Sequence, residues 1–241
     1  MTLDDRGDTS HAEAVEQVAL ACRIIAAFGY EDLTLGHVSL RPAGDDRAFI
    51  KRKGVALGEV TPGDVIDIYL DDPDCLTTPG MHLEAAIHVE VYRSRPDVGA
   101  VIHGHPLYAT ALSATSTDSA YLEFLTHDSA LFVDGLGIYD DSAELITTIE
   151  QGKAVADALG SRRAVLLKNH GVVIVGEDIR WAVLAAATLE RAVRLQVLAR
   201  SLGQIDPLSR EAAESLFPAK YQDDLLDEYW ALWERRFGAH D

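Results

Sequence analysis

Apolar side chains recur at spacings of three and four residues in several segments of the chain, and this period is typical of amphipathic helices. The pattern predicts helices over residues 10–28, 82–95 and 178–202, and a fourth, less regular one over 142–159. The expected ends agree with residues that stop helices, because Gly29, Pro96 and Gly203 follow the first three segments. Asp178 stands where an N-cap is expected.

Shorter apolar runs between these helices are typical of strands. They cover residues 48–50, 65–70, 99–103, 165–167 and 172–175. Strands mixed with helices favour an α/β fold in which helices cover the faces of a sheet. No segment resembles a linker or a repeat, so we expect residues 1–205 to form one domain. Residues 206–241 are acidic and rich in aromatic side chains, and we expect a helical tail that packs on the body or on a neighbouring subunit.

The charge balance narrows the range of partners. The chain has 241 residues with 39 acidic and 21 basic side chains, a formal net charge of −18. Such a chain lacks the cations that bind nucleic acid or anionic membranes, while 48% hydrophobic residues exclude an acidic disordered protein. The apolar stretch 181–199 contains Glu190, Arg191 and Arg194, so it is no membrane span. Two cysteines and an acidic N-terminus without a signal-peptide pattern fit a soluble cytoplasmic protein.

Three histidines follow predicted strands. His103 and His105 enclose Gly104 at the end of one strand, and side chains two residues apart on a strand point to the same face. His170 precedes Gly171, which predicts a sharp turn that presents this imidazole at the end of another strand. Each motif alone is more typical of a structural or loop histidine than of a metal ligand. Together they predict three imidazoles around a catalytic metal ion with an open coordination position.

Glu84 begins the helix that leads into the strand of His103. It shares a helix face with His88, four residues later. A carboxylate at a helix N-terminus is stabilised by the helix dipole, which is one interpretation of this residue. The other is an acid/base group beside the metal ion.

The order of these motifs resembles the class II aldolase/adducin family. The resemblance extends from about Ala12 to Ala199 and includes the segment 36–39 (Gly-His-Val-Ser), the segment 95–97 (Arg-Pro-Asp) and Glu190. It implies a three-layer α/β/α sandwich around a mostly antiparallel sheet, assembled as a homotetramer with active sites at subunit interfaces. It also implies one divalent metal ion per subunit, with His103, His105 and His170 as its ligands. Imidazole suits zinc, manganese, cobalt or iron.

The resemblance further assigns Glu84 as the catalytic acid/base, and a glutamate here argues against the family's epimerase branch. His127 lies in a segment that approaches a neighbouring subunit's site in the family; it is either a proton donor or a surface residue. Tyr221 and Tyr229 are further candidates, because some relatives use a C-terminal tyrosine, although packing also explains them. The residues that match or replace substrate-binding positions are Gly36, His37, Ser39, Lys51, Arg52, Lys53, Gly54 and Tyr229.

Departures from the phosphate-binding aldolases concern the substrate. Those enzymes have a Thr/Ser-Gly turn where this chain has the basic segment 51–54, and a pair of serines where it has His82-Leu83. His37 replaces their asparagine. The lost hydroxyl groups argue against a sugar phosphate, and three cations suit a carboxylate. A solvated hairpin edge is the other interpretation of the basic segment.

These observations lead to three hypotheses. The first is a metal-dependent carbon–carbon lyase that decarboxylates a hydroxylated aromatic carboxylate or dicarboxylate, a small anionic substrate. The second is an aldolase that cleaves a small ketose or ketose phosphate. The third is a non-catalytic interaction module like the adducin head, although this chain retains all three histidines and Glu84.

Overall fold

The computed structural model describes residues 11–142 and 144–238. In this part of the chain, strands pair into one central sheet with the order β3-β2-β1-β4-β7-β6-β5. Only β5 and β6 are parallel there, and the other neighbours are antiparallel. The strands are β1 (His37–Leu40), β2 (Arg47–Lys51), β3 (Val65–Tyr69), β4 (Ala100–Gly104), β5 (Gly137–Tyr139), β6 (Ala164–Leu167) and β7 (Gly171–Gly176).

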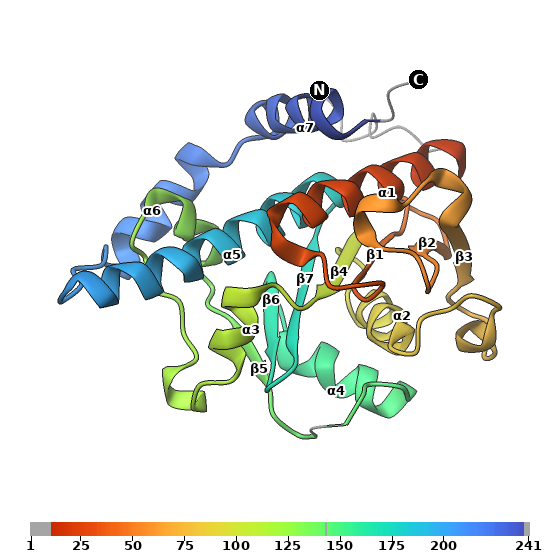
Figure 1. The fold of residues 1–241 in the computed structure, drawn as a ribbon, viewed down its shortest axis with the longest axis horizontal. Coiled ribbons are helices and arrows are strands. Elements are labelled where there is room, and N and C mark those ends of the chain that lie inside the picture. Colours follow the sequence, from red (N-terminus) through yellow and green to blue (C-terminus); the bar gives the residue numbers. More distant parts are fainter. Residues whose placement is uncertain (1–10, 143, 239–241) are drawn as a thin grey trace.

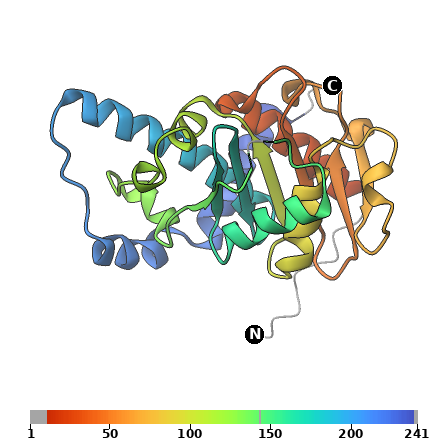
Figure 2. The same cartoon turned by 90° about the horizontal axis from the view of Figure 1, so that it is seen from below.

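Helices cover both faces of this sheet. One face carries α1 (His11–Ile25) and α5 (Ile179–Leu202), and the other carries α2 (Ala85–Ser94) and α4 (Ile149–Leu159), as Figures 1 and 2 show. Strand β4 serves both layers, because Ile102 belongs to the core under α1 and α5 and Val101 to the core under α2 and α4. The predicted three-layer α/β/α fold with a mostly antiparallel sheet is therefore confirmed.

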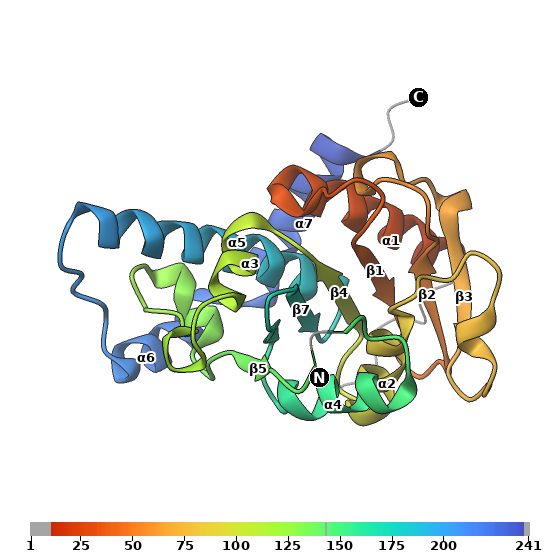
Figure 3. The same cartoon turned by 60° about the horizontal axis from the view of Figure 1, so that its bottom comes forward.

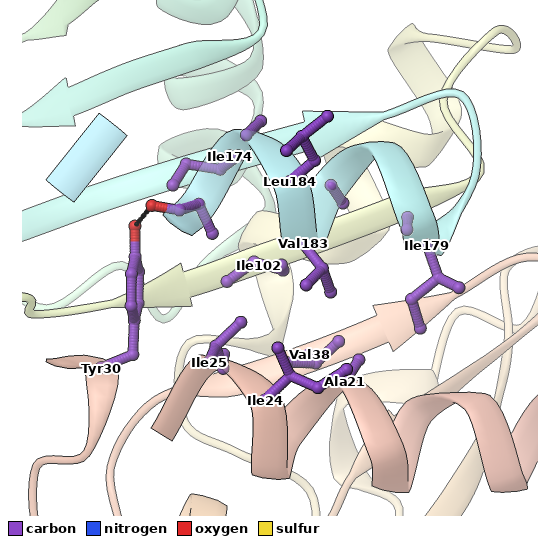
Figure 4. Close-up of a cluster of buried hydrophobic side chains, with 14 of the residues drawn as sticks. Ala21, Ile24, Ile25, Tyr30, Val38, Ile102, Ile174, Ile179, Val183 and Leu184 are labelled. Carbon is purple, nitrogen blue, oxygen red and sulfur yellow. Dashed lines mark hydrogen bonds between the residues drawn. The ribbon is translucent and has the colours of Figure 1, made fainter. Parts of the chain in front are cut away.

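The first core joins distant parts of the sequence. Figure 4 shows side chains of α1 and α5 meeting over the strands, with Ile24, Val183 and Ile102 among them. The hydroxyl of Tyr30 donates to the carbonyl oxygen of Ala186 at 3.0 Å, which ties the end of the α1 segment to α5. The ring of Tyr30 also lies against Gly104. The core thus directly supports the segment that carries His103 and His105.

Two predicted helices illustrate how local signals succeed and fail. Helix α5 begins as expected, because the Asp178 carboxylate accepts hydrogen bonds from the backbone of Arg180 and Trp181. Helix α4 begins at Ile149, seven residues later than predicted. Thr148 caps it by accepting from Gln151 N. None of the helices in the described ranges is both long and apolar enough to cross a lipid bilayer.

Two strands were not predicted, β1 and β5. Residues 37–40 alternate polar and apolar, which is a strand signal, but the segment is only four residues long. It becomes a strand because β2 and β4 pair with it on its two sides. The alternation places His37 and Ser39 together on one face of the sheet. This face carries part of the site described below.

The C-terminal segment forms helices α6 (Arg210–Lys220) and α7 (Asp223–Phe237). Trp230 and Trp233 of α7 belong to the core formed by α1 and α5. Arg23 of α1 donates to the carbonyl oxygen of Phe237 at 2.7 Å. Both helices therefore lie on the body of the same chain, with α7 over α1 in Figure 1 and α6 near the projecting end of α5 in Figure 3. Contact with a neighbouring subunit stays a prediction.

The remaining helix, α3 (Leu107–Ser113), follows directly after His105-Pro106. The Glu190 carboxylate on α5 accepts hydrogen bonds from the backbone of Tyr108 and Ala109, both at 2.9 Å. These bonds satisfy donors at the N-terminus of α3 that have no partner within the helix. Glu190 thus fixes the chain immediately after the histidine pair.

Candidate metal centre

Four side chains converge at one end of the sheet. One ligand atom each from Glu84, His103, His105 and His170 lies within 4.8 Å of the others. The ring centroids of the three histidines are 5.0 Å apart in each pairing. The structure thus brings together the four residues that the sequence analysis assigned to the metal ion and its acid/base group.

His103 and His105 owe their orientation to neighbours of β4. Nδ1 of His103 lies 3.1 Å from the carbonyl oxygen of Val172, to which it donates, and Nδ1 of His105 lies 3.0 Å from Oδ2 of Asp32. With Nδ1 protonated, Nε2 carries the lone pair that a metal ion needs. Among the described residues, both Nε2 atoms are buried without a hydrogen-bond partner. Such orphaned acceptors fit a metal ligand set.

His170 stands in the tight connection between β6 and β7. Its backbone N–H donates to the carbonyl of Leu167 at 3.0 Å. Gly171 was expected to make the turn, but the residue in the left-handed region is Asn169, with φ of 55°. Gly171 is needed for a different reason. A Cβ atom there would lie 2.5 Å from the carbonyl oxygen of Gly104 and 2.7 Å from Cδ2 of His105.

Glu84 immediately precedes α2 and has one of its carboxylate oxygens fixed. Oε1 accepts from the backbone N–H of Ile146 at 3.0 Å, while Oε2 lies 3.5 Å from Nε2 of His103 and 3.4 Å from Nε2 of His170. Burial acts to raise the pKa of Glu84, but the interactions with these two histidines outweigh it and hold the pKa below its ordinary value. Glu84 is therefore ionised at neutral pH.

A chain of buried polar groups continues from the cluster into the protein. The ring of His37 lies 5.0 Å from that of His103, and its Nδ1 is 2.6 Å from Nε2 of His88. Ser39 Oγ lies 2.6 Å from Nδ1 of His88 and 2.7 Å from the hydroxyl of Tyr92. Ser39, which we expected to contact the substrate, instead has these polar contacts inside the network. His88 likewise contacts His37 and Ser39 inside this network.

The three basic residues 51–53 lie in two different environments. Lys51 is the last residue of β2 and is fully buried, so the expectation of three loop cations is wrong for this residue. Burial lowers the pKa of Lys51. Arg52 and Lys53 are exposed, and Arg52 pairs with Asp64 at 2.9 Å. Gly54, with φ of 85°, makes the following turn. The strand is buried on both faces from Ala48 to Lys51, whereas Arg52 lies beyond its end, which is why Lys51 and Arg52 differ.

Other sequence-predicted residues lie outside the cluster of this chain. His127 is exposed at the start of the short helix His127–Phe132. Tyr229 lies on α7, with its ring 6.3 Å from that of Trp233. Tyr221 donates its hydroxyl to the carbonyl of Asp128 at 2.7 Å. A role for His127 or Tyr229 in a neighbouring subunit's site stays a prediction.

Two polar residues near the cluster were assigned no role from the sequence. Asp32 contacts His105, and the ring of His82 lies 4.4 Å from that of His37. Burial lowers the pKa of His82 to about 3, so this imidazole is neutral. The sequence offered no signal for Asp32, because a loop residue carries no periodicity. His82 was visible only as a replacement of a serine.

Residues 16–197 match the family model of the class II aldolase and adducin N-terminal domain. The chain belongs to this family. It is 29% identical over 204 residues to 3,4-dihydroxyphthalate decarboxylase of Arthrobacter keyseri, which covers 80% of this chain and 82% of that protein. It is 30% identical over 165 residues to L-fuculose phosphate aldolase of Methanocaldococcus jannaschii, which covers 68% of this chain and 84% of the relative.

The fold has solved counterparts as well. The structure of L-fuculose 1-phosphate aldolase from Glaciozyma antarctica superimposes with a TM-score of 0.78 at 24% sequence identity, covering 95% of this chain and 91% of the other. The likeness at this identity concerns the fold. One of the two sequence relatives is named a decarboxylase and the other an aldolase, and both are lyases, so the prediction of a lyase is confirmed. The cluster of Glu84 and the three histidines is compatible with one divalent metal ion.

Proposed function

We propose that this protein is a metal-dependent decarboxylase of a hydroxylated aromatic carboxylate. The observation that carries the proposal is the convergence of three imidazoles, two with orphaned Nε2 atoms, beside the Glu84 carboxylate. His103, His105 and His170 would hold one divalent ion, with zinc, manganese, cobalt and iron all suited to imidazole. Such an ion supplies Lewis acidity that stabilises negative charge developing on a substrate oxygen.

Glu84 is suited to move the proton. Because it is ionised at neutral pH, its carboxylate can accept the proton of a substrate hydroxyl. When the bond to the substrate carboxyl group breaks, carbon dioxide leaves and the electron pair stays on the ring carbon. Glu84 then returns the proton to that carbon. The hydrogen bond from Ile146 holds the carboxylate in one orientation for both transfers.

The surroundings of the cluster support an aromatic anion as substrate. A cavity of about 170 Å³ adjoins His170, and its lining combines apolar side chains such as Tyr139, Leu145 and Ile146 with polar and charged ones (Ser142, Glu144, Lys168 and Asn169). An aromatic ring would contact the apolar side chains of this mixed lining. The relative from Arthrobacter is named for a dihydroxyphthalate, a substrate of this chemical class. We propose that Arg52 and Lys53 meet a second carboxylate.

The test is an assay panel on the metal-loaded protein. We expect carbon dioxide release from ortho-hydroxylated benzoates or phthalates, and loss of this activity in the His103→Ala variant and after chelation. Formation of dihydroxyacetone phosphate from ketose phosphates, without carbon dioxide release, would identify an aldolase instead. That alternative keeps the same cluster and is supported by the relative from Methanocaldococcus.

Metal analysis separates both enzymes from a non-catalytic module. We expect about one divalent ion per chain after purification, and a lower unfolding midpoint on adding a chelator, because a ligand that binds only the folded state stabilises it. A protein with neither property would be an adducin-like interaction module. We further propose the homotetramer that the family resemblance implies, which light scattering after size-exclusion chromatography tests.

A further inference from the structure

Lys51 has a buried position that the proposed reaction leaves unexplained. Its Nζ lies 3.1 Å from the carbonyl oxygens of Thr34 and Gly36, and 3.3 Å from Nε2 of His82. An ammonium group has three N–H donors, and these acceptors use all three. The buried ammonium group of Lys51 thus has no N–H left to donate to a substrate.

The two carbonyl groups belong to one turn, residues 31–36, which leads into β1. The backbone N–H of Leu35 donates to the carbonyl of Asp32 at 2.9 Å. Leu33 has φ of 52° and Gly36 has φ of 72°, both in the left-handed region. Leu33 carries a side chain in this unfavourable region, so the turn needs support from outside. Lys51 supplies two hydrogen bonds to it.

The same turn carries Asp32, whose Oδ2 lies 3.0 Å from Nδ1 of His105. This contact keeps the proton of His105 on Nδ1 and the lone pair on Nε2. The Nε2 atom is buried without a hydrogen-bond partner among the described residues. Carboxylates that accept from a ligating histidine in this way orient the ring and raise its basicity as a ligand.

We propose that Asp32 and Lys51 are positioning residues for the metal ligand His105. Lys51 holds the turn in its strained form, the turn holds the Asp32 carboxylate, and Asp32 fixes the tautomer and orientation of His105. Lys51 is therefore a structural cation of the metal centre and not a clamp for a substrate carboxylate. This inference rests on the proposed metal site, because it concerns the readiness of one ligand to bind the ion.

The first test measures zinc affinity of the apo protein by competition with a chromogenic chelator. We expect Asp32→Ala to weaken zinc binding about 10- to 100-fold, and Asp32→Asn, whose amide oxygen can still accept from Nδ1, to weaken it less. Asp71→Ala, which removes an exposed carboxylate elsewhere, is the matched control and leaves the affinity unchanged. If wild type binds zinc at the cluster and the Kd of Asp32→Ala for zinc is within twofold of the wild-type Kd, the positioning role is refuted. If wild type binds no zinc, the metal site itself fails.

The second readout is the tautomer of His105. If Asp32 only stabilised the turn, its replacement would leave this tautomer unchanged. Nitrogen-15 chemical shifts of the apo protein report which ring nitrogen carries the proton, with His105→Gln identifying the signal. We expect protonation at Nδ1 in wild type and a mixture of tautomers in Asp32→Ala. An unchanged tautomer in the variant would contradict the inference even if zinc affinity fell.

The third test links Lys51 to Asp32. Lys51→Met removes the ammonium group and keeps most of the volume, and we expect it to weaken zinc binding several-fold. Because both residues act through one turn, the double variant should bind zinc no more weakly than Asp32→Ala alone, within about twofold. Additive losses, or wild-type zinc affinity in Lys51→Met with loss of carboxylate inhibitor binding, would instead assign Lys51 to the substrate. If Lys51→Met fails to fold, the Asp32 variants, on an exposed turn, still decide the role of Asp32.

Discussion

Nδ1 of His37 lies 2.6 Å from Nε2 of His88, in a polar chain that leads from the metal-ligand cluster into the core. Only one of these two nitrogens can carry the shared hydrogen, so the pair cannot be doubly protonated without breaking this contact. Burial first, and the neighbouring histidines second, hold the pKa of both well below the ordinary value. The folded protein therefore needs neutral imidazoles here.

This pair predicts destabilisation in acid. Below the unfolded-state pKa of about 6.5, the unfolded chain binds protons that the folded His88 does not, so the free energy of unfolding falls as the pH falls. Each such histidine contributes up to about 1.4 kcal/mol per pH unit. Urea unfolding of the chelated protein between pH 8 and pH 5 measures the slope. We expect His88→Gln to reduce the pH dependence of the free energy of unfolding by about one proton. Equal slopes in wild type and His88→Gln would contradict the prediction.

Glu84→Gln is expected to separate metal binding from catalysis. The amide keeps an oxygen that can accept from Ile146, so the fold and the metal content should persist. Turnover should fall about 10²- to 10⁴-fold, the usual loss when a general acid/base is removed. Glu90→Gln is the matched control, because Glu90 is a buried carboxylate on the same helix that pairs with Arg93. Turnover of Glu84→Gln within threefold of wild type would exclude Glu84 as the proton carrier.

Gly171→Ala is expected to damage the metal centre through sterics alone. Its Cβ would meet backbone of Gly104 at 2.5 Å, and neither β4 nor β7 can move without disturbing the ligands. We expect a loss of roughly 1–3 kcal/mol in the free energy of unfolding together with weaker metal binding. Gly63→Ala is the control, since the nearest atom to its Cβ is 3.7 Å away. Similar behaviour of the two variants would show that close packing at Gly171 is unimportant.

Arg52→Ala and Lys53→Ala test the proposed contact with a second carboxylate, with Lys51 retained. We expect the double variant to raise KM about tenfold or more and to change kcat less, because a charge-assisted hydrogen bond contributes roughly 1.5–3 kcal/mol. Asp64→Asn removes the ion-pair partner of Arg52 and controls for a purely structural effect. An unchanged KM in the double variant would show that these cations face solvent only.

The cluster of three histidines and Glu84 was predictable because part of its evidence is local. His103 lies on β4 and His105 one residue beyond its end, and the two-residue spacing in this extended segment puts both imidazoles on one side. Helix starts were predicted with mixed success, as the caps Asp178 and Thr148 show. A side chain that caps its own helix is visible in sequence, but the start of α4 was misplaced because several polar residues before Thr148 could have served.

The sequence by itself therefore determined the layered α/β fold, the three imidazoles and Glu84, since short-range periodicity and motif order specify them. Only the tertiary structure decided what Lys51, Asp32 and Gly171 do. Each of these depends on a group far away in sequence: Lys51 on the carbonyls of a turn, Asp32 on His105, and Gly171 on the backbone of β4. The register and stacking of strands bring such groups into contact, and no local pattern encodes them.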